Sequence, residues 1–397
     1  MNAKVFGMIK NALRSICVLL LIISFSFEAF CLENGDLSAA SAVLYCPGTG
    51  DVLFQKDAYQ LRSMASTTKI MTALLALEQN TPDRIIEITD EMVNVEGTSA
   101  GLRAGDKITL EDIVYSMMLE SGNDAANAAA IAISGSFSGF AALMNQRAKE
   151  IGMKNTSFVT PSGLDDTNHY TTCYDMALLA AEAMENKDFR RICSTSSYKV
   201  EYVDSDKTVT LYNHHKMLSS FEGCLGIKTG FTKKSGRCLV TAAERNGVML
   251  IAVTLKAPDD WNDHAKMLEY GFTQVESVAL DTDFSVFSVN VAGSDIKSLK
   301  VEGENASVPV FVSDSGKEIS RKIYLEKFLY APVEEGAAAG FAEYYIGDKM
   351  IKKVPLTVVG SAPVKEREKS FFEQLKDKIT GLLFHRKLLV SYEIKGF

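Results

Sequence analysis

A serine and a lysine stand three positions apart at Ser66 and Lys69, within the string Ser-Thr-Thr-Lys. A serine hydroxyl is a poor nucleophile until a neighbouring base takes its proton, and a neutral lysine amine can do this. If a helix begins at Ser66, positions i and i+3 share one face and the amine reaches the hydroxyl. The start of a helix also stabilises developing negative charge. The pair therefore predicts a nucleophilic serine with a lysine proton acceptor.

The same spacing occurs twice more, at 196–199 and 294–297, so the pattern alone is weak. Both of these stretches have the composition of strands, in which residues three apart face opposite sides. Only the first string is followed by apolar residues at helical spacing, namely Ile70, Met71, Leu74, Leu75 and Leu77. We therefore assign the nucleophile to Ser66.

A second polar string, Ser121-Gly122-Asn123, lies between two segments with helical periodicity. A second hydroxyl can pass a proton to a leaving amine, and an asparagine amide can hold a peptide carbonyl. The alternative is an ordinary helix-capping loop, to which these residues are well suited. The string by itself leaves both interpretations open.

A third string, Lys228-Thr229-Gly230, lies in a stretch with strand character. An ammonium beside a hydroxyl suits a substrate carboxylate, and a glycine lets a ligand approach the strand backbone. A similar string at 234–236 is better explained as a hairpin turn. For either string, the alternative is a solvated strand edge protected by lysines.

Apolar periodicity outlines the elements that must position these residues. Helices are predicted to follow Ser66 and to span 110–119, 124–133, 139–151 and 261–270, with Gly271 as the C-cap of the last. Strands are predicted at 41–45, 52–54, 225–229, 238–243 and 248–255. Asn246-Gly247 is a strong hairpin signal, so an antiparallel meander is expected in this region.

The N-terminus has the features of an export signal. Basic residues Lys4, Lys10 and Arg14 precede an apolar run over 16–27, which is too short to span a bilayer comfortably. We therefore expect residues 1–31 to be a signal peptide; an uncleaved anchor and a lipoprotein site at Cys31 are the weaker alternatives. The mature protein would be extracytoplasmic.

Composition excludes some classes of function. The chain has 397 residues, which favours more than one domain, and its net charge of −8 argues against a nucleic-acid partner. Five scattered cysteines remain after the signal, at Cys46, Cys173, Cys193, Cys224 and Cys238. Their odd number and spacing favour small buried apolar residues over disulfides or a metal site.

The C-terminal third has a different texture. Short strands without long helices predict a small β domain over 284–360, followed by a charged linker at 361–370. One helical face then carries Phe371, Phe372, Leu375, Ile379, Leu382 and Leu383. Residues 365–387 hold seven basic and four acidic side chains, so an interfacial helix on an anionic membrane is favoured. The alternative is a helix docked on the protein's own core.

The ordered triple of strings is far more specific than any one of them, because it is the signature of penicillin-binding proteins and class A β-lactamases. The chain resembles the low-molecular-mass D-alanyl-D-alanine carboxypeptidases, the serine penicillin-binding proteins of peptidase family S11. The resemblance is strong over about 35–275 and includes the segments 65–72, 121–126, 163–165, 174–176 and 226–232. It implies an α/β fold in which an antiparallel sheet is flanked by helices, with the catalytic domain over 32–283 and the β-rich domain after it.

The resemblance also implies roles for individual residues. Ser66 forms the acyl-enzyme, Lys69 accepts its proton and Ser121 shuttles a proton. Asn123 binds the peptide bond of the substrate, Lys228 and Thr229 bind the terminal carboxylate, and Gly230 completes the substrate-binding string. The backbone N–H groups of Ser66 and Phe231 form the oxyanion hole. The implied substrate is a peptidoglycan stem peptide, β-lactams are inhibitors, the protein associates with the outer face of the cytoplasmic membrane, and no metal or organic cofactor is needed.

Three alternatives remain at this point. A class A β-lactamase needs a glutamate to activate the deacylating water, and no Glu-x-x-Leu-Asn string follows Asn123. A transpeptidase shares the acyl-enzyme and differs only in the acceptor. A non-catalytic wall-binding protein is disfavoured because all three strings are intact.

Overall fold

The computed structural model describes residues 31–365, 371, 373–376, 378 and 379. They divide into two compact units. The first contains the described residues up to Val278 together with Ser307–Gly316, and the second contains Ala279–Ala306 and the described residues from Lys317 onward. The predicted signal peptide, apart from Cys31, and Phe372, Leu382 and Leu383 of the predicted tail helix lie outside the described residues.

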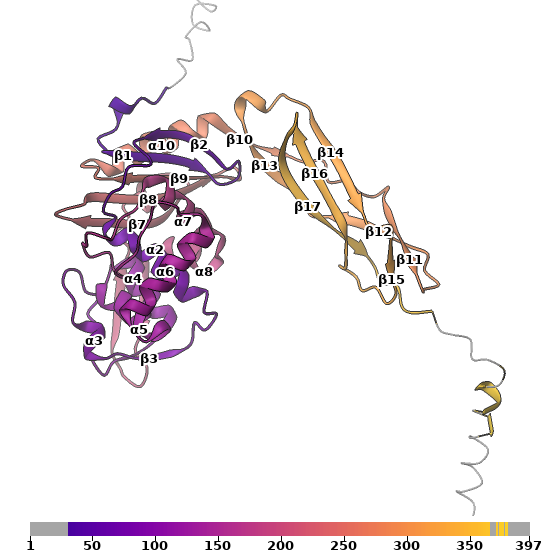
Figure 1. The fold of residues 1–397 in the computed structure, drawn as a ribbon, viewed down its shortest axis with the longest axis horizontal. Coiled ribbons are helices and arrows are strands. Elements are labelled where there is room, and N and C mark those ends of the chain that lie inside the picture. The colour runs from indigo at the N-terminus through magenta and orange to yellow at the C-terminus, as the bar shows by residue number, and fades with distance from the viewer. Residues whose placement is uncertain (1–30, 366–370, 372, 377, 380–397) are drawn as a thin grey trace, which may run out of the picture. The chain divides into compact units, whose positions relative to one another are not determined.

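The first unit is built on a five-stranded antiparallel sheet with the order β2-β1-β9-β8-β7 (Figure 1). Its strands are β1 (Ser41–Cys46), β2 (Asp51–Lys56), β7 (Cys224–Thr232), β8 (Gly236–Arg245) and β9 (Val248–Leu255). The β8–β9 hairpin turns at Asn246 and Gly247, whose φ angles of 51° and 78° suit a tight turn that follows the twist of the strands. Because β7 is an edge strand, one of its sides is open for a substrate to approach.

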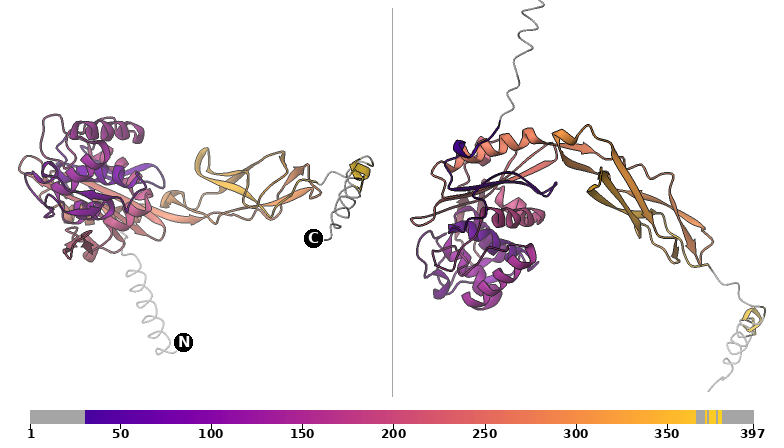
Figure 2. Two further views of the ribbon diagram at one scale, coloured as in Figure 1. Left: turned by 90° about the horizontal axis from the view of Figure 1, so that it is seen from below. Right: turned by 45° about the horizontal axis from the view of Figure 1, so that its top comes forward.

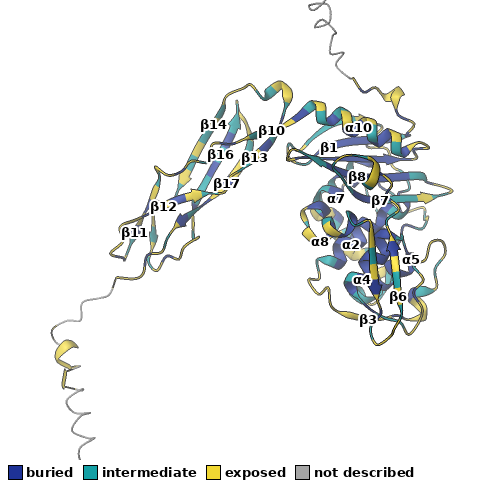
Figure 3. Cartoon of the chain, turned by 180° about the vertical axis from the view of Figure 1, so that it is seen from behind, coloured by how far each residue is buried: buried dark blue, intermediate teal, exposed yellow. Residues whose placement is uncertain are grey.

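Helices cover both faces of this sheet. One face packs on α10 (Asp260–Gln274), and the other packs on a larger helical layer. That layer contains α2 (Lys69–Leu77), α4 (Leu110–Leu119), α5 (Asn123–Ser134), α6 (Phe137–Ile151), α7 (Cys173–Glu185) and α8 (Lys187–Cys193). Figure 3 shows that α2 and α4 are largely buried within it. The fold class expected from the sequence, an antiparallel sheet flanked by helices with a β-rich C-terminal domain, is confirmed.

Local sequence explains where these helices begin and end. The Thr109 hydroxyl accepts a hydrogen bond from the Asp112 N–H and caps the start of α4. Gly135 and Gly152, with φ angles of 72° and 91°, end α5 and α6 in the left-handed conformation that glycine adopts at little cost. Short elements complete the unit: η1 (Asn34–Asp36), η2 (Ala65–Thr68), η3 (Val312–Asp314), α3 (Asp90–Val93), α9 (Met217–Ser220), β3 (Ile85–Glu87), β4 (Lys107–Thr109), β5 (Ser197–Glu201) and β6 (Thr208–Tyr212).

The prediction that Gly271 caps the last helix is wrong. Helix α10 continues to Gln274, and Gly271 lies inside it. A Cβ atom at this position would lie 2.7 Å from side-chain carbons of both Leu44 and Leu250. Glycine therefore allows close packing of the helix on the sheet, which a sequence pattern alone does not distinguish from a helix end.

The second unit consists of strands and turns over Ala279–Ala306 and 317–365, followed by the described helical residues beyond 370 (Figure 2). Six strands form one sheet with the order β14-β16-β17-β12-β11-β15. They are β11 (Ser288–Ala292), β12 (Ser298–Gly303), β14 (Ile319–Leu325), β15 (Phe328–Tyr330), β16 (Ala338–Ile346) and β17 (Lys349–Val359). The strand expected near residue 308 is β13 (Ser307–Phe311), which belongs to the first unit and pairs with β10 (Val275–Ala279).

The structure also places the third Ser-x-x-Lys string and bears on membrane-spanning helices. Ser294 and Lys297 lie in the turn between β11 and β12, not in a strand, and the lysine donates to the backbone carbonyl of Ser294 and not to its hydroxyl. No individual helix of the described residues is long and apolar enough to cross a membrane, although α5 and α6, which meet at 85°, pass that test as a pair.

Candidate active site

Ser66 and Lys69 are brought together by a tight turn at the start of α2. Ala65–Thr68 form a 3-10 helix, and α2 begins at Lys69, so the regular helix starts three residues later than expected. The Thr67 and Thr68 hydroxyls donate to the carbonyls of Met64 and Ala65, which closes the turn. Because residues i and i+3 eclipse in a 3-10 helix, the Lys69 amine lies over Ser66. Its Nζ is 3.0 Å from the Ser66 Oγ.

The Lys69 side chain is completely buried and has two further partners. Its Nζ lies 2.7 Å from the Asn123 Oδ1 and 2.8 Å from the Ser162 carbonyl oxygen. Burial, and secondly the charge of Lys228, hold the pKa of Lys69 well below its usual range, against the opposing effect of Asp124. A neutral amine has two N–H groups and one lone pair. With the two N–H groups on Asn123 and Ser162, the lone pair faces the Ser66 hydroxyl and can accept its proton.

A second segment of the chain supports the turn from behind. Gly163 has a φ of 88°, and a Cβ atom there would lie 1.9 Å from the Ala65 carbonyl oxygen. His169 accepts a hydrogen bond at Nδ1 from the Val159 N–H at 2.9 Å, so its ring proton is on Nε2, which lies 2.8 Å from the Thr68 hydroxyl oxygen. Burial lowers the pKa of His169 to about 4, which keeps the ring neutral. No pattern in the sequence indicates a role for this histidine.

Ser121 lies between α4 and α5 in a strained conformation. Its φ is 61°, in the left-handed region that costs a non-glycine residue about 1–3 kcal/mol and is concentrated at functional sites. Gly122 is the N-cap of α5 and no side-chain hydrogen bond caps the helix, so the string begins the helix through its backbone and not through the Ser121 hydroxyl or the Asn123 amide. The backbone N–H of Asn123 donates to the Thr98 carbonyl at 2.8 Å, and its side-chain amide donates to the Glu96 carbonyl at 2.6 Å.

Asp124 organises the loop that carries these carbonyl groups. Its carboxylate is buried and accepts hydrogen bonds from the Ser99 hydroxyl and from the backbone N–H groups of residues 100–102 and 125. The loop packs so closely that a Cβ atom on Gly122 would lie 2.7 Å from the Ala100 Cβ. Thus Asp124 fixes the loop, and the loop fixes Asn123 against Lys69.

Edge strand β7 brings the third string to the same place. A Cβ atom on Gly230 would lie 3.0 Å from the Ser66 backbone nitrogen and 3.1 Å from that of Thr67, so a side chain at this position would crowd the turn. The Lys228 side chain is buried, and its Nζ donates to the Thr229 carbonyl at 3.1 Å. Burial lowers the pKa of Lys228 to about 7. The 234–236 string forms the turn after β7, as expected, with Ser235 hydrogen-bonded to Thr232.

A pocket of about 420 Å³ joins these elements. Five predicted site residues line it: Ser66, Ser121, Thr229, Gly230 and Phe231. Lys69, Asn123 and Lys228 lie buried behind that lining. The phenyl ring of Phe231 is largely solvent-exposed, so its side chain is available to a ligand while its backbone belongs to the strand.

Sequence reasoning missed several residues of the pocket wall, namely Thr98, Glu120, His214, Lys216, Arg237, Asp260 and Trp261. Arg237 donates to Asp260 at 2.8 and 2.9 Å and lies over the Trp261 ring. His214 Nε2 lies 3.0 Å from a carboxylate oxygen of Glu120. Each pair joins residues distant in the chain, and no spacing rule could have indicated either.

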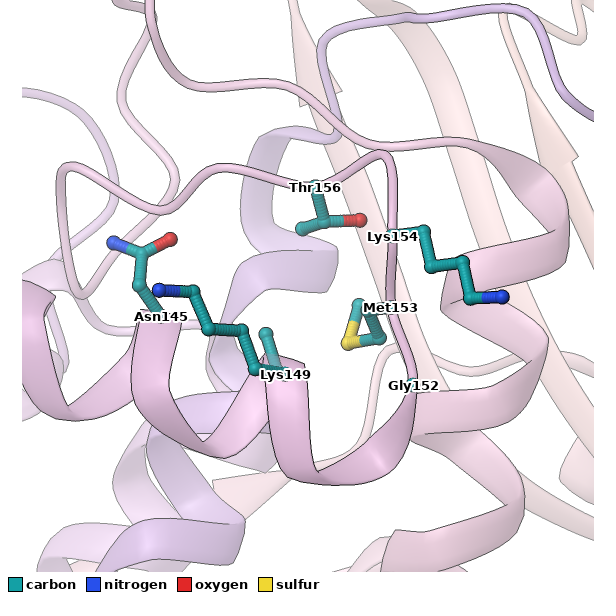
Figure 4. Close-up of a pocket in the computed structure, with 7 residues that line it drawn as sticks. Asn145, Lys149, Gly152, Met153, Lys154 and Thr156 are labelled. Carbon is teal, nitrogen blue, oxygen red and sulfur yellow. The ribbon is translucent and has the colours of Figure 1, made fainter.

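Features outside this pocket carry less chemistry. A separate pocket at the end of α6 is lined by residues that include Lys149, Met153 and Lys154, and it contains none of the predicted site residues (Figure 4). Among the described residues, no group of three or more histidine, cysteine or acidic side chains could hold a metal ion. The five cysteines of the predicted mature chain are free, and all except Cys224 are buried.

Comparison with known proteins covers both units. The family model of D-alanyl-D-alanine carboxypeptidase, peptidase S11, matches residues 28–259. The model of the penicillin-binding protein 5 C-terminal domain matches residues 278–362. The D-alanyl-D-alanine carboxypeptidase DacF of Bacillus subtilis is 29% identical over 376 residues, which are 90% of this chain and 94% of the relative.

Solved structures agree with these matches. The D-alanyl-D-alanine carboxypeptidase DacD from Francisella tularensis has a TM-score of 0.60 and 26% identity, covering 86% of this chain and 98% of its own. The Streptomyces K15 DD-transpeptidase has a TM-score of 0.58 and 33% identity, covering 61% of this chain and 99% of its own.

Proposed function

Because the chain belongs to peptidase family S11, the D-alanyl-D-alanine carboxypeptidases, we propose that the pocket on β7 is its active site and that Ser66 is the nucleophile. The chain is a serine-type carboxypeptidase of the penicillin-binding class. This membership disfavours the β-lactamase and the non-catalytic wall-binding protein that the sequence left as alternatives. The family acts outside the cytoplasm on peptidoglycan peptides and binds β-lactams. The observation that carries the assignment of Ser66 is its 3.0 Å contact with the buried amine of Lys69.

The proposed reaction passes through an acyl-enzyme. The Ser66 hydroxyl loses its proton to the lone pair of Lys69, and its oxygen attacks the carbonyl carbon of the penultimate D-alanine. The resulting oxyanion is held by the backbone N–H groups of Ser66 and Phe231. Ser121 protonates the leaving nitrogen and takes up the proton held by Lys69, so Lys69 is neutral again as the C–N bond breaks and D-alanine departs. Water, deprotonated by Lys69, then hydrolyses the ester and regenerates the Ser66 hydroxyl.

Asn123, Lys228, Thr229 and Gly230 position the substrate in this proposal. The Asn123 amide holds the peptide bond, and Gly230 leaves room for the peptide beside β7. Lys228 and Thr229 bind the terminal carboxylate, the only group that distinguishes a chain end from an internal peptide bond. A charge-assisted hydrogen bond contributes about 1.5–3 kcal/mol. A substrate with an amidated C-terminus should therefore react roughly ten to a hundred times more slowly than the free acid.

The test uses a pentapeptide that ends in D-Ala-D-Ala together with a fluorescent penicillin. Ser66→Ala should abolish both D-alanine release and labelling. The matched controls Ser196→Ala and Ser294→Ala should retain both, because neither serine has a lysine amine on its hydroxyl. Labelling that persists in Ser66→Ala would refute the assignment. Adding a D-amino acid acceptor separates hydrolysis from transpeptidation.

We also propose that residues 1–31 are removed on export and that residues 365–397 anchor the enzyme to the outer face of the cytoplasmic membrane. Phe371, Leu375 and Ile379 are helical and solvent-exposed, and their spacing places them on one face. Deletion of 365–397 should release an active enzyme into the soluble fraction. A truncated protein that still pellets with membranes in high salt would exclude the tail as the anchor.

A further inference from the structure

The Ser121 hydroxyl has no side-chain hydrogen bond of its own within the described part of the chain. In the proposed reaction this hydroxyl moves a proton, so its orientation must be defined. The backbone of Ser121, however, is strained, with a φ of 61° between two helices. Something outside the Ser-Gly-Asn string must therefore hold it. The residue immediately before it, Glu120, is the C-cap of α4 and lines the same pocket.

Both oxygens of the Glu120 carboxylate are held by a distant segment of the chain. Oε1 accepts a hydrogen bond from the Tyr212 backbone N–H at 2.7 Å. Oε2 lies 3.0 Å from the Nε2 of His214. These partners lie at the end of β6 and just after it, 92 and 94 positions further along the chain. A carboxylate with two such bonds has a fixed orientation, because charge-assisted hydrogen bonds are short and strong.

The segment that holds Glu120 is itself anchored. Asn213 donates to the carbonyls of Cys193 and Thr195 at 3.0 Å and accepts from the His215 N–H at 2.9 Å. The buried His215 ring lies 3.0 Å from the Thr241 hydroxyl of β8. The ring also meets the Trp261 ring edge-on. Residues 213–215 therefore form a rigid support tied to the sheet, from which His214 reaches the pocket.

We propose that Glu120 is a positioning residue, clamped by Tyr212 and His214, that fixes the backbone of Ser121 and thereby aims its hydroxyl at the leaving nitrogen. The inference rests on the role of Ser121 in the proposed reaction. It explains why a strained conformation persists at this point, since strain survives only where the surroundings determine it. It also assigns a purpose to a glutamate in the pocket wall that takes no part in the proton transfers.

The expected effect follows from the geometry of proton transfer. A misplacement of about 1 Å at a reacting group costs roughly a hundredfold in rate. Glu120→Ala removes both arms of the clamp and should lower kcat on the peptide substrate at least tenfold. Glu120→Gln keeps an oxygen for the Tyr212 N–H and an amide N–H for the His214 ring, so it should restore most of the activity. A role that needs the negative charge would not be rescued by glutamine.

The decisive readout compares an amide substrate with its thioester analogue. A thiolate leaves without protonation, so a defect in aiming the Ser121 proton should slow the amide and spare the thioester. The control is Glu111→Ala. This substitution removes an ion pair between Glu111 of α4 and Arg191 of α8. It should leave the amide-to-thioester ratio unchanged. Melting temperatures and penicillin titration report whether each variant is folded.

Each outcome decides between the possibilities. If Ser121→Ala and Glu120→Ala both slow the amide selectively, the inference stands. If Ser121→Ala does so and Glu120→Ala slows both substrates equally or neither, the positioning role is refuted while the proposed function survives. If Ser121→Ala shows no selectivity, the proton-shuttle role of Ser121 fails first. If Glu120→Ala does not fold, His214→Ala takes its place and should slow the amide relative to the thioester by a smaller factor. His214→Gln, which can still donate to Glu120, should restore the wild-type ratio.

Discussion

The pH dependence of the reaction should report the two buried lysines separately. Lys69 must be neutral to accept the proton of Ser66, and its pKa is well below the usual range because of burial and the charge of Lys228. Lys228 must be charged to bind a carboxylate, and burial lowers its pKa to about 7. Acidification should therefore protonate Lys69 and reduce the rate, whereas alkalinisation should discharge Lys228 and also reduce it.

The size of the alkaline decline follows from the pKa of Lys228. With a value of about 7, the charged fraction is roughly 0.9 at pH 6 and about 0.01 at pH 9. Because kcat/KM reports the ionisations of the free enzyme, it should fall by about ninetyfold over this interval on the carboxylate substrate. At the acidic end, kcat/KM should rise with pH until Lys69 is neutral.

The assay is D-alanine release from the pentapeptide between pH 5 and 9.5, at substrate concentrations well below KM. Lys228→Arg keeps a positive charge throughout this range, because the arginine pKa exceeds 12, so its alkaline decline should disappear even if its maximum rate is lower. Lys234→Arg, in the neighbouring turn, should keep the wild-type profile. A kcat/KM that stays flat from pH 7 to 9, or an alkaline decline that persists in Lys228→Arg, would refute the assignment of Lys228.

Three further perturbations test the structure around the site. Lys228→Met should lower kcat/KM at least tenfold yet raise the free energy of unfolding by up to about 5 kcal/mol, because burial moves the lysine pKa from 10.5 to about 7. Urea unfolding should show the full gain below pH 7 and none above pH 10.5. Gly163→Ala should slow penicillin acylation at least tenfold, because its Cβ would overlap the Ala65 carbonyl in the turn that carries Ser66. The control Gly152→Ala has a similar φ but open space around the Cβ, so it should change stability and not acylation. His169 and His215 are buried and neutral, with pKa values lowered to about 4. The free energy of unfolding should therefore be unaffected by either histidine above pH 6.5, and each should lower it by about 3 kcal/mol as the pH falls to 4. The pH dependence of urea unfolding should become shallower in His169→Gln, and an unchanged slope would contradict this.

Elements with a purely local signal were predictable from the sequence. The helix at 110–119 and the strand at 248–255 have the predicted bounds in α4 and β9. In both cases the periodicity is uninterrupted and a specific residue marks the boundary, either the capping hydroxyl of Thr109 or the turn at Asn246 and Gly247. These preferences act between residues a few positions apart, so the sequence carries them directly.

The types of the site residues were also readable from the sequence, but their arrangement was not. Three strings contain an Ser-x-x-Lys spacing, and only the tight turn at Ala65–Thr68 brings a lysine amine onto a serine hydroxyl. From the sequence, Gly271 could either end a helix or allow one to pack closely. In the structure it lies against Leu44 and Leu250 of the sheet, so it serves close packing. In each case the deciding contact comes from a residue far away in the chain.

The chemistry of the site depends most on tertiary structure. Lys69 and Lys228 have the same composition as any exposed lysine, and their pKa values fall because the folded chain removes water from around them. Likewise, Glu120 is one acidic residue among many until β6 and the segment after it deliver a backbone N–H and an imidazole to its two oxygens. Sequence determined which groups could react, through local preferences of the backbone and the order of the motifs. Desolvation and long-range contacts, which exist only in the folded chain, decided which of those groups are set to do so.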